Sequence, residues 1–360
     1  MDLHAPAARE ESGVNGAAEK TLNLALQGGG AHGAYAWGVL DRLLEDERLA
    51  FPAITATSAG AMNAVALVSG YVTGGREGAR ASLEAFWRKV ADIGAWFKPA
   101  SRYAPPHFAD WFNLDNWLAY GMLEAISRNV SPYDLNPLNY NPLRDVLAET
   151  IDFEAVRSCK LTKLFISATA VESGQVRIFR THEITADAVL ASACLPNLFQ
   201  AVEIDGAHYW DGGYIGNPSL WPLFYEVECR DLLVIQINPM RREQTPQRAS
   251  EILNRINEIS FNSSLLKEMR AIAFVQRLLR EGWLKEEYRD RLKDVLFHAI
   301  RADEHLKDLS VASKFNVSWS FFSDLKVRGR RAAESWLDAH YKDLGRRDSV
   351  DLTKEFLEPA

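Results

Sequence analysis

The chain has 360 residues, of which 47% are hydrophobic and 25% are charged. These proportions are ordinary for a folded globular protein and exclude a disordered or collagen-like chain. The 48 acidic residues outnumber the 41 basic ones, and the acidic excess lies in the first 240 residues, which argues against a nucleic-acid partner. The cysteines at positions 159, 194 and 229 are far apart, so we expect reduced thiols and neither a disulfide framework nor a zinc site.

Residues 1–20 mix charged and small side chains without an apolar run, which predicts a flexible leader and not a secretory signal. Residues 51–75 carry no charge, but Pro52, Asn63 and several serines and threonines interrupt them. We therefore predict a buried strand, a turn and a buried helix there, and no membrane span. These features predict a cytoplasmic protein, with peripheral contact at the inner membrane face as an option.

The first strong elements are two successive strand–helix units. An apolar strand over 22–26 runs into a glycine-rich segment over 27–33 and then into an amphipathic helix over 34–49. A second strand over 52–57 leads into an apolar helix over 61–69. Two such units in succession predict a mainly parallel sheet covered by helices, and hence an α/β fold.

Further along, a helix is expected over 79–90. Aromatic residues then crowd an irregular stretch over 96–120, which fits core packing, an acyl channel or a membrane interface. Three prolines over 131–143 predict an ordered loop. Strands over 164–171 and 176–180 predict a hairpin about Gly174, and a further strand is expected over 232–237.

Beyond Pro239 the pattern becomes mostly helical, with a basic balance that is compatible with lipid contact or a dimer face. The expected elements there are helices over 249–259, 265–280 and 330–340 and an edge strand over 295–300. The expected division of the chain is a leader over 1–20, a catalytic domain over 21–240 and a helical extension over 241–360.

The glycine loop spells Gly28-x-Gly30-x-x-Gly33 between a strand and a helix. A dinucleotide site would need an acidic residue at the end of the second strand, and residues 56–60 contain none. A kinase loop would need motifs that do not follow. Consecutive glycines at a helix N-terminus instead expose unobstructed N–H groups, which suits a negative charge such as a transient oxyanion.

Two further turns carry reactive side chains. Ala56-Thr57-Ser58-Ala59-Gly60 joins a strand to a helix, with the layout of a turn that projects a nucleophilic serine. Asp211-Gly212-Gly213 follows a short predicted hairpin over 205–211. Each turn alone is common in proteins. The functional interpretation therefore depends on finding the glycine loop and both turns in one chain, in this order and at this spacing.

Together these motifs resemble the patatin-like phospholipase family over about residues 21–240. That family combines a G-G-G-x-[RK]-G loop, a G-x-S-x-G elbow and a D-G-[GA] acid, and residues 191–196 are similar to its S-x-A-x-P stretch. The resemblance implies a three-layer α/β/α fold with a mainly parallel central sheet. Ala56 replaces the first elbow glycine, and His32, mostly neutral near pH 7, replaces the basic residue of the loop.

The resemblance also implies a serine acyl hydrolase without metal or cofactor. Ser58 would attack a fatty-acyl ester, Asp211 would act as its base, and an acyl-enzyme would form. Burial would have to raise the Asp211 pKa. Backbone N–H groups would form the oxyanion hole. The residues assigned to that hole are Gly28, Gly29 and Gly30, and the motif positions supporting the site are His32, Gly33, Ala56, Gly60, Gly212 and Gly213.

Several alternatives stay open at this point. A conventional triad would recruit His182, His208 or His32. The substrate of a lipid hydrolase would be a phospholipid or lysophospholipid, with a polyhydroxyalkanoate polyester or a thioester as rivals. A catalytically weak lipid-binding or scaffold protein is a further alternative, and the oligomeric state is open.

Overall fold

The computed structural model describes residues 19–96, 130–242, 245–247, 249–289, 291–309 and 311–357. The predicted leader up to residue 18, and the predicted aromatic stretch from residue 97 onward, lie outside the described residues. The described strands are β1 (Lys20–Thr21), β2 (Asn23–Leu26), β3 (Leu49–Ala50), β4 (Ala53–Ala56), β5 (Lys163–Ala170), β6 (Val176–Arg180), β7 (Val202–Ile204), β8 (Ala207–Asp211), β9 (Asp231–Gln236) and β10 (Leu296–Arg301).

The described α-helices are α1 (Gly33–Glu45), α2 (Ala59–Trp96), α5 (Pro132–Leu135), α6 (Pro142–Thr150), α7 (Phe153–Ser158), α8 (Ala186–Ser192), α9 (Trp221–Tyr225), α10 (Ala249–Arg280), α11 (Glu286–Arg289), α12 (Trp319–His340) and α13 (Leu352–Phe356). Short 3-10 turns are η1 (Gly30–His32), η3 (Thr181–Glu183), η4 (Gly212–Tyr214), η5 (Val311–Phe315) and η6 (Tyr341–Asp343).

An 8-stranded sheet forms the centre of the described part of the chain, in the order β10-β9-β2-β4-β5-β8-β7, with β6 also paired to β5. Strands β10, β9, β2, β4 and β5 are parallel. Strands β6 and β8 run antiparallel to β5, and β7 runs antiparallel to β8. The sheet is therefore mainly parallel, as predicted, with an antiparallel edge.

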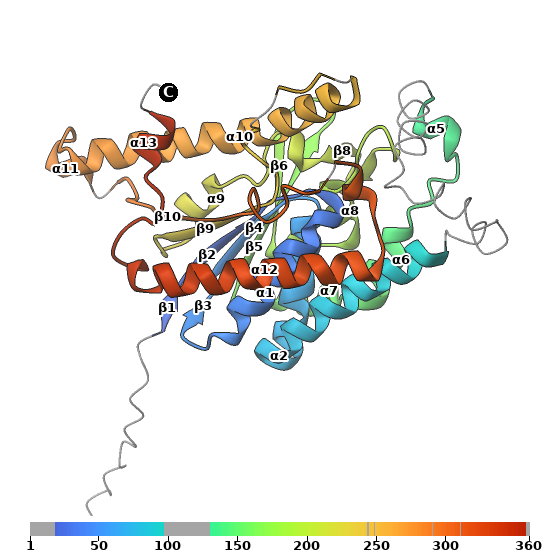
Figure 1. Ribbon diagram of the computed structural model, residues 1–360, viewed down its shortest axis with the longest axis horizontal. Helices are drawn as coiled ribbons and strands as arrows, with labels where there is room; N and C mark the ends of the chain where they lie inside the picture. The colour runs from blue at the N-terminus through green and yellow to red at the C-terminus, as the bar shows by residue number, and fades with distance from the viewer. Residues whose placement is uncertain are drawn as a thin grey trace, which may run out of the picture.

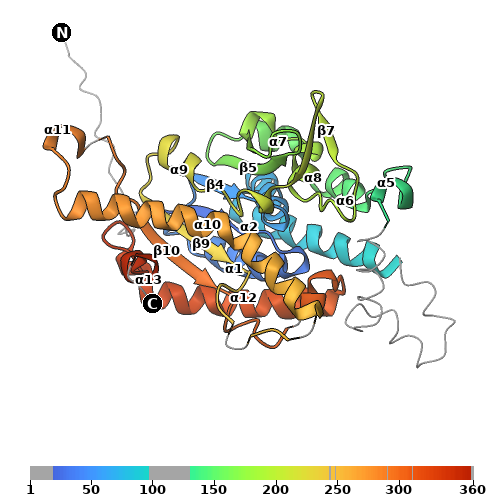
Figure 2. The same cartoon turned by 90° about the horizontal axis from the view of Figure 1, so that it is seen from above.

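Both faces of this sheet are buried, which explains why its strands are apolar at successive positions. Leu24 and Leu26 of β2 belong to a core that includes residues of α1, α2 and α12. Ala25 belongs to a second core with Leu265 and Met269 of α10. Figures 1 and 2 show β9 and β10 between α10 on one side and α12 on the other. The result is the predicted three-layer α/β/α architecture.

Several helices differ from the predicted ones. The helices predicted over 61–69 and 79–90 are longer and meet at a break, where Gly74 and Gly75 have non-helical dihedrals. The two helices predicted after residue 249 form one continuous α10. The predicted proline loop instead contains α5 and α6, because Pro132 and Pro142 occupy first helical turns after the N-cap residues Ser131 and Asn141.

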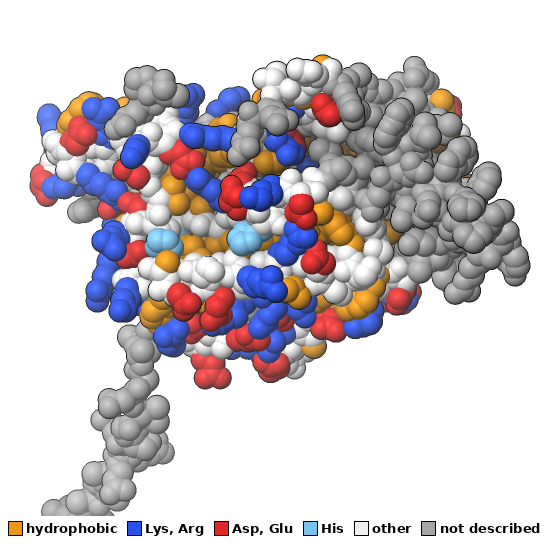
Figure 3. All heavy atoms as spheres, viewed as in Figure 1, with side chains coloured by type: hydrophobic (Ala, Val, Ile, Leu, Met, Phe, Trp, Pro, Cys, Tyr) orange, Lys and Arg blue, Asp and Glu red, His pale blue; other side chains and the backbone are white. Residues whose placement is uncertain are grey.

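The C-terminal extension contributes to both the sheet and its cover. Strand β10, the predicted edge strand, pairs in parallel with β9 over six residues, and α12 packs along α1. Ion pairs cross the surface of this helix pair, such as Arg330 with Glu45 at 2.9 Å. Basic and acidic side chains are interspersed on the face of the molecule that α12 occupies (Figure 3). None of the described helices is long and apolar enough to span a bilayer.

Candidate active site

Strand register brings the predicted motifs to one edge of the sheet. Leu26 of β2 pairs with Ala56 of β4, and Ala56 pairs with Ile166 of β5. Asp211 of β8 pairs with Ala168, two residues further along β5. Gly28 and Ser58 each lie two residues beyond the β2–β4 pair, so both reach the same level as Asp211. The carboxyl ends of parallel strands are where α/β proteins commonly hold ligands.

Ser58 occupies a sharp strand-to-helix turn. Its φ of 55° is in the left-handed region, which is rare for a residue with a side chain and indicates local strain. The Ser58 N–H donates to Ser192 Oγ at 2.9 Å, which holds the turn. A Cβ on Gly60 would lie 2.3 Å from the Leu26 carbonyl oxygen, so strand and helix approach too closely there for any side chain.

Ala56 does not distort this turn. It is a buried residue of β4 that takes part in regular strand pairing with Leu26 and Ile166. It is not among the described residues with positive φ. The backbone at this position therefore has no need for the glycine that the family pattern places there.

Asp211 is buried, and its carboxylate lies close enough to the Ser58 hydroxyl for hydrogen bonding to act to lower the Asp211 pKa. The carboxylate accepts the Gly213 N–H at 2.7 Å. Burial raises the Asp211 pKa to about 7, although these hydrogen bonds act to lower it. A Cβ on Gly212 would lie 2.1 Å from the Ser167 carbonyl oxygen, so the acid turn requires glycine. A serine hydroxyl therefore lies near a buried carboxyl group whose pKa is about 7.

The glycine loop runs beside Ser58. A Cβ on Gly28 would lie 2.6 Å from Ser58 Cβ, which explains the glycine. The Gly28 N–H donates to Asn217 Oδ1 at 2.7 Å, so this N–H is engaged within the chain, and its assignment to the oxyanion hole stays a prediction. Among the described residues, neither the Gly29 nor the Gly30 N–H donates a hydrogen bond. Gly30 has φ of +59° and opens the turn that precedes α1.

The three predicted histidine alternatives lie apart from the Ser58–Asp211 pair. His32 is buried, and its Nε2 hydrogen-bonds to Ser313 Oγ at 2.7 Å. His208 is half-buried and hydrogen-bonds through Nδ1 to Glu172 at 2.7 Å. His182 lies exposed on η3. Within the described residues, no hydrogen bond joins a histidine to either member of the pair.

Asparagines that the sequence analysis did not single out support the glycine loop. Asn217 accepts the Gly28 N–H, and Asn238 donates through Nδ2 to the Gly28 carbonyl oxygen at 2.6 Å. Ser192, whose hydroxyl accepts the Ser58 N–H, was also given no role in the sequence analysis. Asn217 lies shortly after the acid motif, and Asn238 directly follows the strand predicted over 232–237. Neither asparagine belongs to a local sequence pattern that would identify it as part of the site.

No cluster of three or more His, Cys, Asp or Glu side chains within the described ranges could hold a metal ion. A surface cavity of about 570 Å³ lies away from the pair, lined by residues of α2 and of the segment 148–152. The groups that the structure brings together at the carboxyl ends of β2, β4 and β5 are the Ser58 hydroxyl, the Asp211 carboxylate and the backbone N–H groups of the glycine loop.

The comparisons with known proteins bear on the same region. A family model described as patatin-like phospholipase matches residues 24–224. Among solved structures, VipD from Legionella pneumophila is similar to this chain with 15% sequence identity and a TM-score of 0.42, over 90% of this chain and 68% of that chain. No curated protein sequence matched. Because the family model covers more than half of the sequence and includes all three motifs, the chain belongs to the patatin-like phospholipase family.

Proposed function

We propose that the protein is a serine acyl hydrolase that uses Ser58 and Asp211 to cleave fatty-acyl ester bonds of phospholipids or lysophospholipids. Family membership supports a lipid ester hydrolase in general terms. The observation that carries the finer proposal is the closeness of the Ser58 hydroxyl to the buried Asp211 carboxylate, whose pKa it acts to lower.

In the proposed reaction, Ser58 Oγ attacks the ester carbonyl carbon while Asp211 takes the hydroxyl proton. The tetrahedral oxyanion collapses, the carbon–oxygen bond to the alcohol breaks, and Asp211 returns the proton to that alcohol. Water then attacks the acyl-enzyme with Asp211 again as base, which releases the fatty acid and restores Ser58. Protons and bonds balance over the cycle without a cofactor.

The electrostatics of the pair support this assignment. A carboxylate with a pKa of about 7 is a far better base than an ordinary aspartate, because proton transfer is most effective when the pKa of the base lies near the working pH. The unengaged N–H groups of Gly29 and Gly30 are suited to bind the developing oxyanion. The N-terminus of α2, which follows Ser58, adds a partial positive charge nearby.

The surroundings of the site suit a lipid substrate. Gly213 lies against Phe261 of α10, whose ring is 5.2 Å from that of Tyr214. On the preceding turns of α10, Ile256 and Ile259 are each 53% exposed. Exposed apolar side chains on the helix that carries Phe261 favour contact with a lipid surface. Peripheral membrane contact is therefore part of the proposal, together with the cytoplasmic location that the sequence predicts.

The decisive experiment compares Ser58→Ala with wild type on p-nitrophenyl acyl esters and on phospholipid vesicles. We expect turnover and labelling by a fluorophosphonate to disappear in Ser58→Ala, because the nucleophile is gone, while the thermal unfolding curve stays unchanged. Ser335→Ala, which alters an exposed serine of α12, is the matched control and should retain full activity.

Undiminished turnover in Ser58→Ala would refute the proposed nucleophile. Lipid binding without turnover in the wild type would instead favour the lipid-binding or scaffold alternative. Activity on thioesters or on polyhydroxyalkanoate, with none on phospholipid, would keep the mechanism and change the substrate class.

A further inference from the structure

The glycine loop has no charged side chain of its own. His32 occupies the loop position that a basic residue could fill, but burial lowers its pKa to about 3, helped by the nearby cations Lys314 and Arg242. The imidazole is therefore neutral throughout the neutral pH range. The cations nearest to His32, Lys314 and Arg242, come from another part of the chain.

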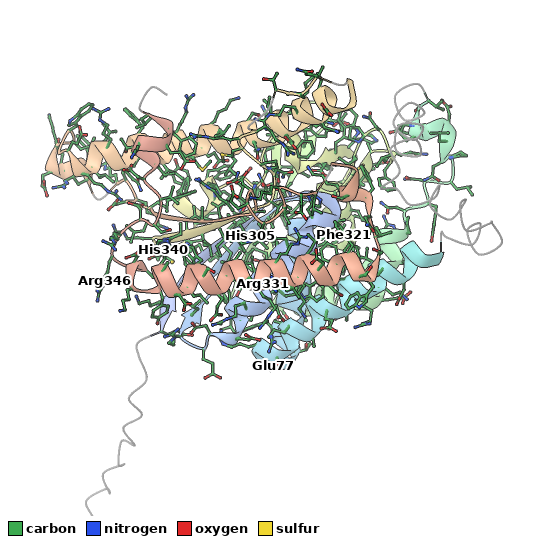
Figure 4. All side chains as sticks on the ribbon, viewed as in Figure 1. Glu77, His305, Phe321, Arg331, His340 and Arg346 are labelled. Atoms are coloured by element: carbon green, nitrogen blue, oxygen red, sulfur yellow. The ribbon has the colours of Figure 1, made fainter. Side chains whose placement is uncertain are left out.

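A segment of the C-terminal extension lies directly on this loop. A Cβ on Gly30 would lie 2.7 Å from the carbonyl oxygen of Lys314 in η5, so the two backbones are in contact. His32 is hydrogen-bonded to Ser313 in the same segment and lies 6.2 Å from the ring of Phe321. Figure 4 labels Phe321 near the start of α12, just after η5. Residues about 280 positions apart in sequence thus form one local structure.

The Lys314 ammonium is linked to the loop by a chain of hydrogen bonds. Lys314 Nζ donates to Asn238 Oδ1 at 2.8 Å, and Asn238 Nδ2 donates to the Gly28 carbonyl oxygen at 2.6 Å. That carbonyl belongs to the same peptide unit as the Gly29 N–H. Each bond in such a chain polarises the next, so the charge on Lys314 withdraws electrons from the Gly28–Gly29 peptide and makes its N–H a stronger donor.

We propose that Lys314 acts through Asn238 as a positioning residue of the oxyanion hole, fixing and polarising the Gly28–Gly29 peptide whose N–H meets the oxyanion. The inference rests on the proposed function, because it presumes an oxyanion at this loop. It assigns to the extension, which lies beyond the matched family region, a part in the chemistry of the catalytic motifs.

The charges around Lys314 determine the pH range in which it works. Burial lowers its pKa to about 8, Glu258 raises it and Arg242 lowers it further. Glu258 itself is held by Arg242 at 2.5 Å and by Arg255 at 3.1 Å, and His32 stays neutral. Since the ammonium loses its proton as pH rises through about 8, the oxyanion donor weakens above that pH.

The experiment measures the acylation rate constant and KM of wild type, Lys314→Met, Lys314→Arg and Asn238→Leu between pH 6 and 10. For Lys314→Met and Asn238→Leu we expect the acylation rate constant at pH 7 to fall about tenfold, less than the loss of a whole oxyanion donor, with KM within about twofold of wild type. Lys314→Arg, which keeps the charge, should recover much of the rate. Lys307→Met is the matched control, because it removes an exposed lysine of the same extension, and it should match wild type.

The pH profile separates this role from simple packing. Wild type should lose activity above about pH 8, Lys314→Arg should keep it to higher pH, and Lys314→Met should show no such decline. An unchanged rate constant in Lys314→Met, or a decline above pH 8 that persists in it, would overturn the inference. If Lys314→Met does not fold, Lys314→Gln, which keeps a donor and removes the charge, gives the same readout.

Failure of this inference is distinct from failure of the proposed function. If wild type hydrolyses esters and Ser58→Ala does not, the nucleophile stands whatever the Lys314 variants show. If wild type has no ester turnover at all, the proposed function itself fails.

Discussion

At the scale of single residues, the site depends on groups held in unfavourable states. Ser58 lies in a left-handed conformation, and Asp211 is a carboxyl group buried among the core residues around η4. Burial raises the Asp211 pKa to about 7 from the usual value near 4. The folded protein therefore binds a proton at this position more tightly than the unfolded chain does, and this has a consequence for stability.

The linkage between proton binding and folding determines how the raised Asp211 pKa changes the stability of the protein with pH. A raised pKa in the folded state contributes stability that is fully present below the unfolded pKa near 4 and is lost as pH rises through about 7. Asp211→Asn has no charge to bury, so we expect its Tm to exceed that of wild type by at least about 2 °C at pH 8 and much less at pH 5. Thermal unfolding at the two pH values measures this difference.

The control for this prediction is Asp338→Asn, which alters an exposed carboxylate on α12. Its Tm difference from wild type should not change with pH. If the Asp211→Asn difference is equally independent of pH, burial does not raise the pKa of Asp211.

At the scale of elements, glycines decide how closely helices α1 and α12 pack. A Cβ on Gly329 of α12 would lie 2.1 Å from the Tyr35 carbonyl oxygen, and a Cβ on Gly38 of α1 would lie 2.1 Å from that of Lys326. These neighbours are backbone atoms, which have little freedom to yield. Helix α1 begins at the glycine loop and α12 follows η5, so this crossing also sets the position of Lys314 over the loop.

Gly329→Val should therefore push the two helices apart. We expect its free energy of unfolding to fall by at least about 2 kcal/mol, because overpacking a tight contact is destabilising. Urea denaturation measures this change. Ser335→Val, which places the same side chain on the exposed face of α12, should change the free energy of unfolding by less than about 0.5 kcal/mol. Equal effects from the two variants would contradict the close crossing.

At the scale of the whole molecule, the residues after 240 are part of the α/β/α structure. Strand β10 extends the sheet beside β9, and α12 covers α1. Leu265 and Met269 of α10 belong to the core on the other face of the sheet. Without these elements, one edge of the sheet and both helical layers would expose apolar surface.

A chain ending at residue 240 is therefore expected to aggregate or to lack a cooperative unfolding transition, even though it retains Ser58 and Asp211. Gel filtration and thermal unfolding followed by circular dichroism test this expectation. Co-expression of residues 241–360 should recover soluble, cooperative material. A monomeric fragment 1–240 that unfolds cooperatively would show that the extension is dispensable for folding.

The sequence by itself determined the parts of this protein that depend on local patterns. The apolar runs before Gly28 and Ser58 predicted β2 and β4, and the edge strand β10 was predicted from its own composition. The turns at Ser58 and Asp211 could be identified because sharp turns demand small residues at fixed positions. Apolar strand runs and small turn residues are required by the local backbone geometry itself, so they can be identified from a single sequence.

Tertiary structure decided what depends on distant contacts. Only the fold shows that Asn217 occupies the Gly28 N–H, that His32 is buried and neutral, and that Lys314 lies on the glycine loop. Periodicity and turn chemistry carry no information about which segments meet across the sheet, because those meetings follow from the packing of both faces at once. Ser58 and Asp211 could be predicted from the sequence. The charged and polar groups around the glycine loop come from segments as far as 281 residues away, and only the fold shows them.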